Sequence, residues 1–454
     1  SGHREVSLMS EADEIALGRQ GDTEIRREMG VYHDDELQRY VSGVGEKLAS
    51  VSHRPSLPWT FTVLDTPVVN AFALPGGFVY VTRGLLAHLE DEAELAGVLG
   101  HEVGHVTARH ASHQYTRSAG SSIGLLLASI FVPGVRPFQD LASAGLGTLF
   151  LKYGREDELE SDRLGVEYAS KAGWDPTGVP RFLETLSRID AMSERGLPNW
   201  LSTHPEPESR VAKARPVADA KTSETQSRNQ DEFLRRVDGL AYGDDPAEGV
   251  VRGSQFLHPD MRIAVDFPEG WQLTNAPDQV VARLDSEKAI MVMRTAGEAR
   301  GASLEDGAAR HMRGLGFKRD QGGPQQLGTL DAYVGDYSGK TKGIGEVKVR
   351  AEHVTVGRQV YMLAGVAPEA DFDRVAPEFD AALRSFRELS GREAAAIRGN
   401  HLALYETKAG DSWQSIAQRA GKGLVSASRL ALMNGFAVNV QPPAGTRVKI
   451  VVEG

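Results

Sequence analysis

The sequence has 454 residues, of which 41% are apolar and 25% are charged, which are the proportions of an ordinary folded globular protein. Its formal net charge is −11 and it has no long basic segment, which argues against nonspecific binding of nucleic acid. The chain contains no cysteine, which excludes disulfides and thiolate metal sites.

The first predicted element that carries chemistry is a helix that begins near Asp91 and contains His101-Glu102-Val103-Gly104-His105. Acidic residues stand in its first turn, and apolar residues recur at helical spacing. Two histidines four positions apart lie about 40° apart around a helix axis, so both rings can reach one metal ion. Glu102 is not a ligand at this spacing and is placed to take a proton from a metal-bound water molecule.

This five-residue pattern has little chance of arising at random. With thirteen histidines in the chain, chance gives roughly 0.03 copies of it. A catalytic zinc site needs a third protein ligand and one open position. Ala111 stands where the metzincin pattern has its third histidine, and helical geometry predicts that His110 points away from His101. His113 would lie about two turns beyond His105.

A glycine- and serine-rich segment around Ile123–Val132 follows this helix. It contains the longest apolar run of the chain, which is too short to cross a bilayer, so we predict no transmembrane span. Two interpretations stay open. The segment is either a buried helix pair or loop over the active site, or a membrane-proximal or substrate-gating flap.

The third ligand is expected from a second helix, which runs from Arg155 to about Gly173. Glu158, Asp162, Gly165 and Ala169 share one stripe of this helix, and its small residues allow close approach to a neighbouring helix. We predict that Glu158 ligates zinc. Asp162, one turn on, would accept the second ring N–H of a ligand histidine and fix its tautomer.

Taken together, these motifs resemble those of peptidase family M48, a family of gluzincins, over about residues 5–240. The resemblance is carried by Asn70–Gly77 with the strand Phe78–Thr82, by His101–His105, by Glu158 with Asp162, and by Ser202–Pro205 with Arg210. It implies a mainly helical, zincin-type metalloprotease domain with a small sheet, acting on protein or peptide substrates.

The resemblance also implies roles for single residues. His101, His105 and Glu158 would be the ligands of one zinc ion per chain, and Glu102 would be the general base. Asp162 would accept a hydrogen bond from a ligand histidine. The strand residues Phe78, Val79, Tyr80 and Val81 match an edge to which a peptide substrate would add as an extra strand.

His204 matches a histidine that can approach the metal and hold the enzyme inactive, and Arg210 matches an arginine near the active site. For His204 three interpretations stay open. It is a turn residue, or a fourth ligand that displaces the water molecule, or a donor that stabilises the developing oxyanion.

Two further domains are predicted after the metallopeptidase domain of residues 1–245. Residues 250–392 alternate strands with a helix at Leu304–Leu315 and end in a long helix at Asp371–Leu389, which predicts an α+β domain with a weak resemblance to PsbP-like domains. Residues 401–454 have the β-α-α-β order and the Gly-Asp-Ser-Trp signal of a LysM-like domain, and they are mildly basic. This resemblance implies affinity for peptidoglycan. The alternative is a LysM-shaped fold that packs on the protease and binds no glycan.

The sequence therefore predicts a multidomain zinc endopeptidase of the bacterial cell envelope, in the periplasm and active in protein quality control. The chain begins at Ser1 without an initiator methionine, so we expect that a leader precedes it, and a lipid anchor there stays open. The alternative function is a wall-associated binding or assembly factor whose zinc site is masked or structural.

Overall fold

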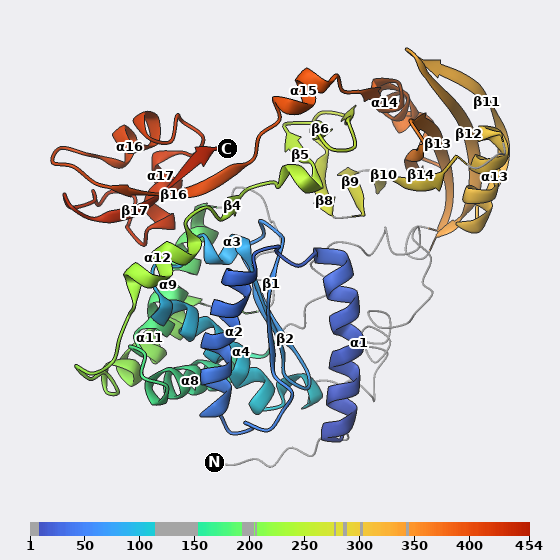
Figure 1. The fold of residues 1–454 in the computed structure, drawn as a ribbon. Coiled ribbons are helices and arrows are strands. Elements are labelled where there is room, and N and C mark those ends of the chain that lie inside the picture. Colours follow the sequence, from blue (N-terminus) through green and yellow to red (C-terminus); the bar gives the residue numbers. More distant parts are fainter. Residues whose placement is uncertain are drawn as a thin grey trace. The chain divides into compact units, whose positions relative to one another are not determined.

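The computed structural model describes residues 9–113, 153–192, 204, 207–276, 278–284, 288–299, 303–341 and 345–454. The apolar segment around Ile123–Val132 lies outside these residues. The chain forms two compact units (Figure 1). The first contains the described residues up to Gly243 together with Asn400–Gly454, and the second contains those of Asp244–Gly399. No helix among the described residues has the length and apolar character needed to cross a bilayer.

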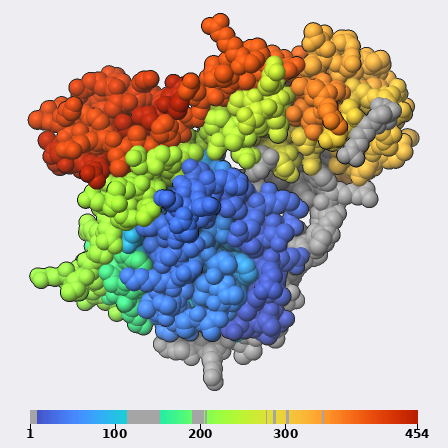
Figure 2. Space-filling view, viewed as in Figure 1, coloured from blue at the N-terminus to red at the C-terminus, as the bar shows by residue number. Residues whose placement is uncertain are grey.

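The first unit begins with two helices whose N-termini are capped by short polar side chains. At the start of α1 (Glu11–Met29) the Ser10 hydroxyl accepts the Asp13 N–H, while the Asp13 carboxylate accepts the Ser10 N–H. At the start of α2 (Asp35–Ser50) the Asp34 carboxylate accepts two backbone N–H groups. Such caps satisfy donors that a helix leaves unpaired. Both helices belong to the blue surface in Figure 2.

A three-stranded sheet lies between α1 and the other helices (Figure 1). The strand order is β1 (Thr60–Leu64), β3 (Phe78–Thr82), β2 (Ala71–Leu74), with β3 parallel to β1 and antiparallel to β2. Alternate side chains face opposite sides, as strand geometry requires. Those that pack toward α1 are Leu64, Phe72, Phe78 and Tyr80, and those that face α2 and α4 are Phe61, Val63, Ala71, Ala73, Val79 and Val81.

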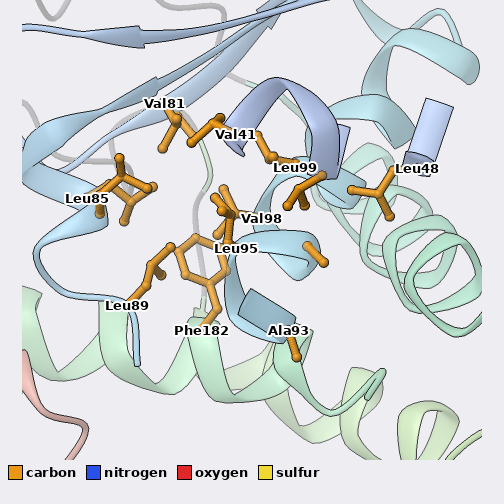
Figure 3. Close-up of a cluster of buried hydrophobic side chains, with 14 of the residues drawn as sticks. Val41, Leu48, Val81, Leu85, Leu89, Ala93, Leu95, Val98, Leu99 and Phe182 are labelled. Atoms are coloured by element: carbon orange, nitrogen blue, oxygen red, sulfur yellow. The ribbon is translucent and has the colours of Figure 1, made fainter. Parts of the chain in front are cut away.

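Helix α4 (Glu92–Thr107) lies at the centre of the first unit. Asp91 caps it by accepting the Glu94 N–H, and every residue from Glu92 to Val106 is buried. Figure 3 shows apolar side chains from α2, β3, α9 (Gly178–Met192) and the short helix α3 (Arg83–Leu86) packed around it. A helix buried on all sides holds its polar residues in a fixed, water-poor environment.

Glycines on α4 and on α8 (Arg155–Lys171) allow these two helices to approach each other closely. A Cβ atom at Gly104 would lie 3.1 Å from Cα of Ser161, and one at Gly165 would lie 3.0 Å from the backbone nitrogen of His101. Ser161 and Gly165 belong to α8, so the two helices meet almost backbone to backbone. Two further helices complete this part, α11 (Pro207–Asp219) and α12 (Gln230–Val237).

The C-terminal residues of the chain pack on this same unit. They form β16 (Asn400–Glu406), α16 (Trp413–Arg419), α17 (Ala427–Met433) and β17 (Arg447–Glu453), the predicted β-α-α-β order. β16 pairs with β17 and also with β4 (Ala241–Tyr242). Leu402, Met433 and Val451 belong to the hydrophobic core that surrounds α4, so the predicted tail and the predicted peptidase domain share one core.

The second unit is built on a seven-stranded antiparallel sheet with the order β11-β12-β13-β14-β10-β9-β8. A smaller sheet has the order β15-β7-β6-β5. The strands are β5 (Val250–Arg252), β6 (Gln255–His258), β7 (Ile263–Asp266), β8 (Gln272–Ala276), β9 (Gln279–Leu284), β10 (Ala289–Glu298), β11 (Lys318–Leu327), β12 (Leu330–Thr341), β13 (Gly345–Val356), β14 (Gln359–Pro368) and β15 (Arg387–Glu388). The helices are η2 (Pro246–Glu248), α13 (Leu304–Gly314), α14 (Phe372–Ser385) and α15 (Gly391–Ala395).

A buried lysine joins the C-terminal residues to the segment before α4. The Lys449 ammonium group donates hydrogen bonds to the carbonyl oxygens of Ala87, at 2.9 Å, and Leu89. Burial lowers the pKa of Lys449 to about 8, and the carboxylates of Glu90 and Glu94 favour its charged form.

We predict that Lys449→Met lowers the free energy of unfolding of the first unit by about 2 kcal/mol, because it leaves two buried carbonyl groups without donors. Thermal unfolding of the full chain, followed by circular dichroism, measures this. Lys408→Met, at an exposed lysine of the same C-terminal residues, is the matched control and should leave the midpoint unchanged. Equal midpoints for the two variants would contradict a stabilising role of the buried ammonium group.

Candidate metal centre

Helix α4 brings two imidazole rings to one point. The Nε2 atoms of His101 and His105 lie 3.0 Å apart, and both side chains are buried. Burial lowers the pKa of His105 well below its ordinary value, although Glu158 opposes this. A neutral imidazole is the form that ligates a metal ion.

Helix α8 adds a carboxylate to the two histidines. The carboxylate oxygens of Glu158 lie 3.6 Å from His101 Nε2 and 3.4 Å from His105 Nε2. Burial alone would raise the pKa of Glu158, but His204, Arg210 and hydrogen bonds from the histidines outweigh it and hold this pKa well below its ordinary value. Glu158 is therefore an anion inside the protein, as a metal ligand must be.

His204 completes a group of four donors. Its Nδ1 atom lies 2.9 Å from Glu158 Oε1 and 3.4 Å from His101 Nε2, and one atom from each of the four residues lies within 4.8 Å of the others. A tetrahedral zinc ion with bonds of about 2.0–2.1 Å places its ligand atoms roughly 3.3 Å apart. The chemistry and spacing of these donors therefore fit zinc.

Asp162 and Arg210 lie directly behind the donor group. Asp162 Oδ1 is 3.0 Å from His101 Nδ1, the ring nitrogen that faces away from the other donors. The Arg210 guanidinium group is 2.6 Å from Asp162 Oδ1 and 2.7 Å from Glu158 Oε2. Arg210 thus bridges the two carboxylates of α8, which fixes both and lowers the cost of burying their charges.

Glu102, the residue next to the first histidine, is buried beside the donor group. The carboxylate oxygen Oε1 of Glu102 lies 3.7 Å from His204 Nε2. One ring nitrogen of His204 therefore faces the other donors, and its second ring nitrogen faces Glu102. All the residues singled out for metal chemistry in the sequence therefore lie in one buried cluster.

The predicted substrate edge is wrong. Phe78, Val79, Tyr80 and Val81 belong to β3, which is the central strand and pairs with β1 on one side and with β2 on the other. Its backbone groups are used within the sheet, so no peptide can add to it. The prediction rested on the family resemblance, and the residues of a strand do not by themselves reveal which strands pair with it. Among the described strands β2 pairs with β3 alone, and its residues Ala73 and Leu74 line a small pocket together with His105.

His110 is not part of the four-residue donor group, as predicted, but the helix does not continue to it. α4 ends at Thr107, and Arg109 adopts a left-handed conformation with φ of 60°. The chain therefore turns back, and His110 Nδ1 comes within 2.9 Å of His105 Nδ1. Spacing along a continuous helix cannot reveal such a contact, because a single left-handed residue ends the helical periodicity. His113 is not part of the four-residue donor group.

An H-E-x-x-H helix, a carboxylate from a second helix and a buried glutamate beside them are the features of a zinc metallopeptidase. Comparison with known families agrees, since residues 35–218 match the model of Peptidase family M48. Over these residues the chain is similar to metallopeptidases of this family.

Two groups of relatives show the range of the match. The chain is 31% identical to the Beta-barrel assembly-enhancing protease of Escherichia coli (strain K12) over 239 residues, which are 51% of this chain and 49% of that protein. It is 35% identical to the Mitochondrial metalloendopeptidase OMA1 of Arabidopsis thaliana over 183 residues, 39% of this chain and 36% of that protein. The chain thus spans half or less of the length of these relatives.

Solved structures give weaker similarities. A cyanobacterial PsbP from Synechocystis, determined in solution, is 15% identical with a TM-score of 0.26, covering 31% of this chain and 95% of that one. A protein of unknown function from Pseudomonas aeruginosa is 17% identical with a TM-score of 0.21, covering 27% of this chain and 88% of that one.

The close contact of α4 with α8 gives a testable prediction. Gly165→Ala places a methyl group 3.0 Å from the His101 backbone nitrogen, so the helices must move apart and carry Glu158 away from the histidines. We expect zinc affinity, measured by competition with a chromogenic chelator, to fall at least tenfold. Gly43→Ala is the matched control, because a Cβ atom at Gly43 of α2 meets nothing within 4 Å and alanine favours a helix. Unchanged affinity in the Gly165 variant would show that the site tolerates a wider helix spacing.

Proposed function

We propose that this chain is a zinc-dependent endopeptidase in which His101, His105 and Glu158 hold the ion and Glu102 is the general base. The observation that supports this most strongly is the convergence of four buried donor atoms at tetrahedral spacing, with the Glu102 carboxylate beside them. A purely structural zinc site has no use for a buried acidic group that is not a ligand, because burying such a carboxylate destabilises the fold.

A bound zinc ion would polarise a water molecule and the scissile carbonyl group. Glu102 would accept the proton that the attacking water loses and would pass it to the nitrogen of the leaving amine. Asp162 would accept the Nδ1 hydrogen of His101, which keeps Nε2 free to ligate. Arg210 would keep Glu158 and Asp162 ionised and in place.

We further propose that His204 is a reversible fourth ligand. Its Nδ1 atom lies 2.9 Å from Glu158 and 3.4 Å from His101, so it would hold the ion as a fourth ligand beside the other three. A water molecule would need this same position for attack. The conformation described here therefore corresponds to a resting enzyme, and His204 has to leave before peptide hydrolysis begins.

The outer edge of the sheet among the described strands, which is β2, is the proposed site for the substrate backbone. Ala73 and Leu74 lie at the end of this strand and share a pocket with His105. A peptide that paired with β2 would run past the metal ligands, and its backbone hydrogen bonds would require no particular sequence. This is a property that suits a protease with many misfolded substrates.

The proposed setting is the bacterial cell envelope, in protein quality control. It is supported by the similarity to the Beta-barrel assembly-enhancing protease, while the similarity to mitochondrial metalloendopeptidases supports the peptidase activity alone. Peptidoglycan binding by residues 401–454 and the boundaries of the three predicted domains stay predictions. The packing of the C-terminal residues on the peptidase core agrees with the alternative of a structural role.

Casein cleavage by the zinc-loaded chain tests the activity. We expect Glu102→Gln to lower the rate at least 100-fold, because an amide cannot accept the proton that the proposed general base takes from water. We expect His204→Ala to raise the rate several-fold, because the fourth position becomes open to water. Bound zinc is measured in each preparation, so that loss of the ion and loss of the base are told apart.

The opposite results would favour the binding or assembly function. If the wild-type chain and His204→Ala both bind one zinc ion and cleave neither casein nor themselves, the site is structural and the peptidase proposal fails. If His204→Ala loses zinc and activity together, His204 is a permanent ligand rather than a reversible one.

A further inference from the structure

The metal ligand His105 has a neighbour on the side opposite to the other donors. Its Nε2 atom faces His101 and Glu158, whereas its Nδ1 atom lies 2.9 Å from Nδ1 of His110. The ring of Tyr153 stacks on His105 with centroids 4.0 Å apart and an angle of 22° between the ring planes. His105 is therefore held by a ring on its face and by a nitrogen atom at its rear edge.

The chemistry of the two rings fixes the direction of this hydrogen bond. A neutral histidine that ligates through Nε2 carries its hydrogen on Nδ1, so His105 must donate and His110 must accept. His110 then carries its own hydrogen on Nε2. That atom faces two carboxylates of α8. Glu160, at 3.4 Å, accepts its hydrogen, and Asp157 lies further off at 3.8 Å. The Ser161 hydroxyl lies 3.4 Å from His110 Nδ1.

The turn that brings His110 back is held by buried charges. Arg109 stands in the left-handed region, which is unfavourable for a residue with a side chain. Its guanidinium group is 2.6 Å from the Glu14 carboxylate of α1, which is almost fully buried and also binds Arg54 at 2.7 Å and the Ser112 hydroxyl. Helix α1 thus anchors the backbone on both sides of His110.

From this arrangement we infer that His110 is a positioning residue for the metal site. It accepts the Nδ1 hydrogen of His105, which selects the tautomer and orientation in which Nε2 can ligate, and its own Nε2–H donates to the carboxylate of Glu160. The Nδ1 atom of His101 faces the carboxylate of Asp162, whereas the Nδ1 atom of His105 faces a second imidazole ring, that of His110. This inference rests on the proposed binding of zinc.

The test compares zinc affinities of the full chain by chelator competition. His110→Phe keeps a ring of similar size and removes the acceptor, and we expect zinc affinity to fall 10- to 100-fold. His110→Asn retains an acceptor near the position of Nδ1, and we expect affinity within about threefold of wild type because such an oxygen can accept the same hydrogen bond. His113→Phe makes the same change at the next histidine of the chain and should leave the affinity unchanged.

Each outcome decides one question. If the wild-type chain binds no zinc, the proposed function fails, whatever the variants do. If the wild type binds zinc and His110→Phe binds it equally well, His110 has no positioning role. Circular dichroism of the metal-free variants shows whether they fold. If the Phe variant does not fold, the nitrogen NMR spectrum of the zinc-loaded wild type decides, because the inference requires the His110 hydrogen on Nε2, and a hydrogen on Nδ1 would overturn it.

Discussion

The metal centre depends on how closely α4 and α8 approach each other. Side chains at Gly100, Gly104 and Gly165 would hold the helix axes apart, and the Glu158 carboxylate could then not meet two imidazole rings of the facing helix. The close approach concentrates acidic and basic groups in a water-poor core. Their mutual hydrogen bonds offset the desolvation of the charges, with Arg210 bridging Glu158 to Asp162. The close packing at these glycines therefore determines where the donor atoms lie, and the chemistry of the site depends on it.

Much of this site could be predicted from the sequence, because its spacing is local. His101 and His105 are one turn apart on one helix, and Glu158 and Asp162 are one turn apart on another, so periodicity alone places each pair on a common face. Periodicity fails where the backbone leaves the helix. The contact of His110 with His105 depends on the left-handed Arg109 and on Glu14 from a distant helix, and nothing in the local sequence reports that interaction. The substrate edge was assigned by resemblance to a family, and only the pairing across the sheet shows that β3 is its central strand.

In the rest of the fold, too, local sequence patterns predict some elements, whereas others depend on tertiary contacts. Strands with several buried apolar residues, such as β9, β13 and β14, lie within residues 250–392, where the sequence predicts strands. β11 has no such apolar pattern, because it is largely exposed and polar, and it is held by pairing with β12 rather than by an apolar face. The predicted helix Asp371–Leu389 ends earlier, at Ser385, and the chain continues into the short strand β15. The predicted order of elements in the C-terminal residues agrees with the structure, but their packing on the peptidase core depends on tertiary contacts such as that of Lys449 with the carbonyl of Ala87.

The pairing of β4 with β16 has a topological consequence for the second unit. Tyr242 lies opposite Asn400 and Ala241 opposite His401 in adjacent antiparallel strands, whose Cα atoms are about 5 Å apart. The polypeptide therefore departs toward the second unit and returns from it at neighbouring points of one ladder, so that this unit is an insertion into a hairpin. An ancestral or engineered protein could lack the whole insertion and close the gap with a tight turn, leaving the ladder and the core beneath it intact.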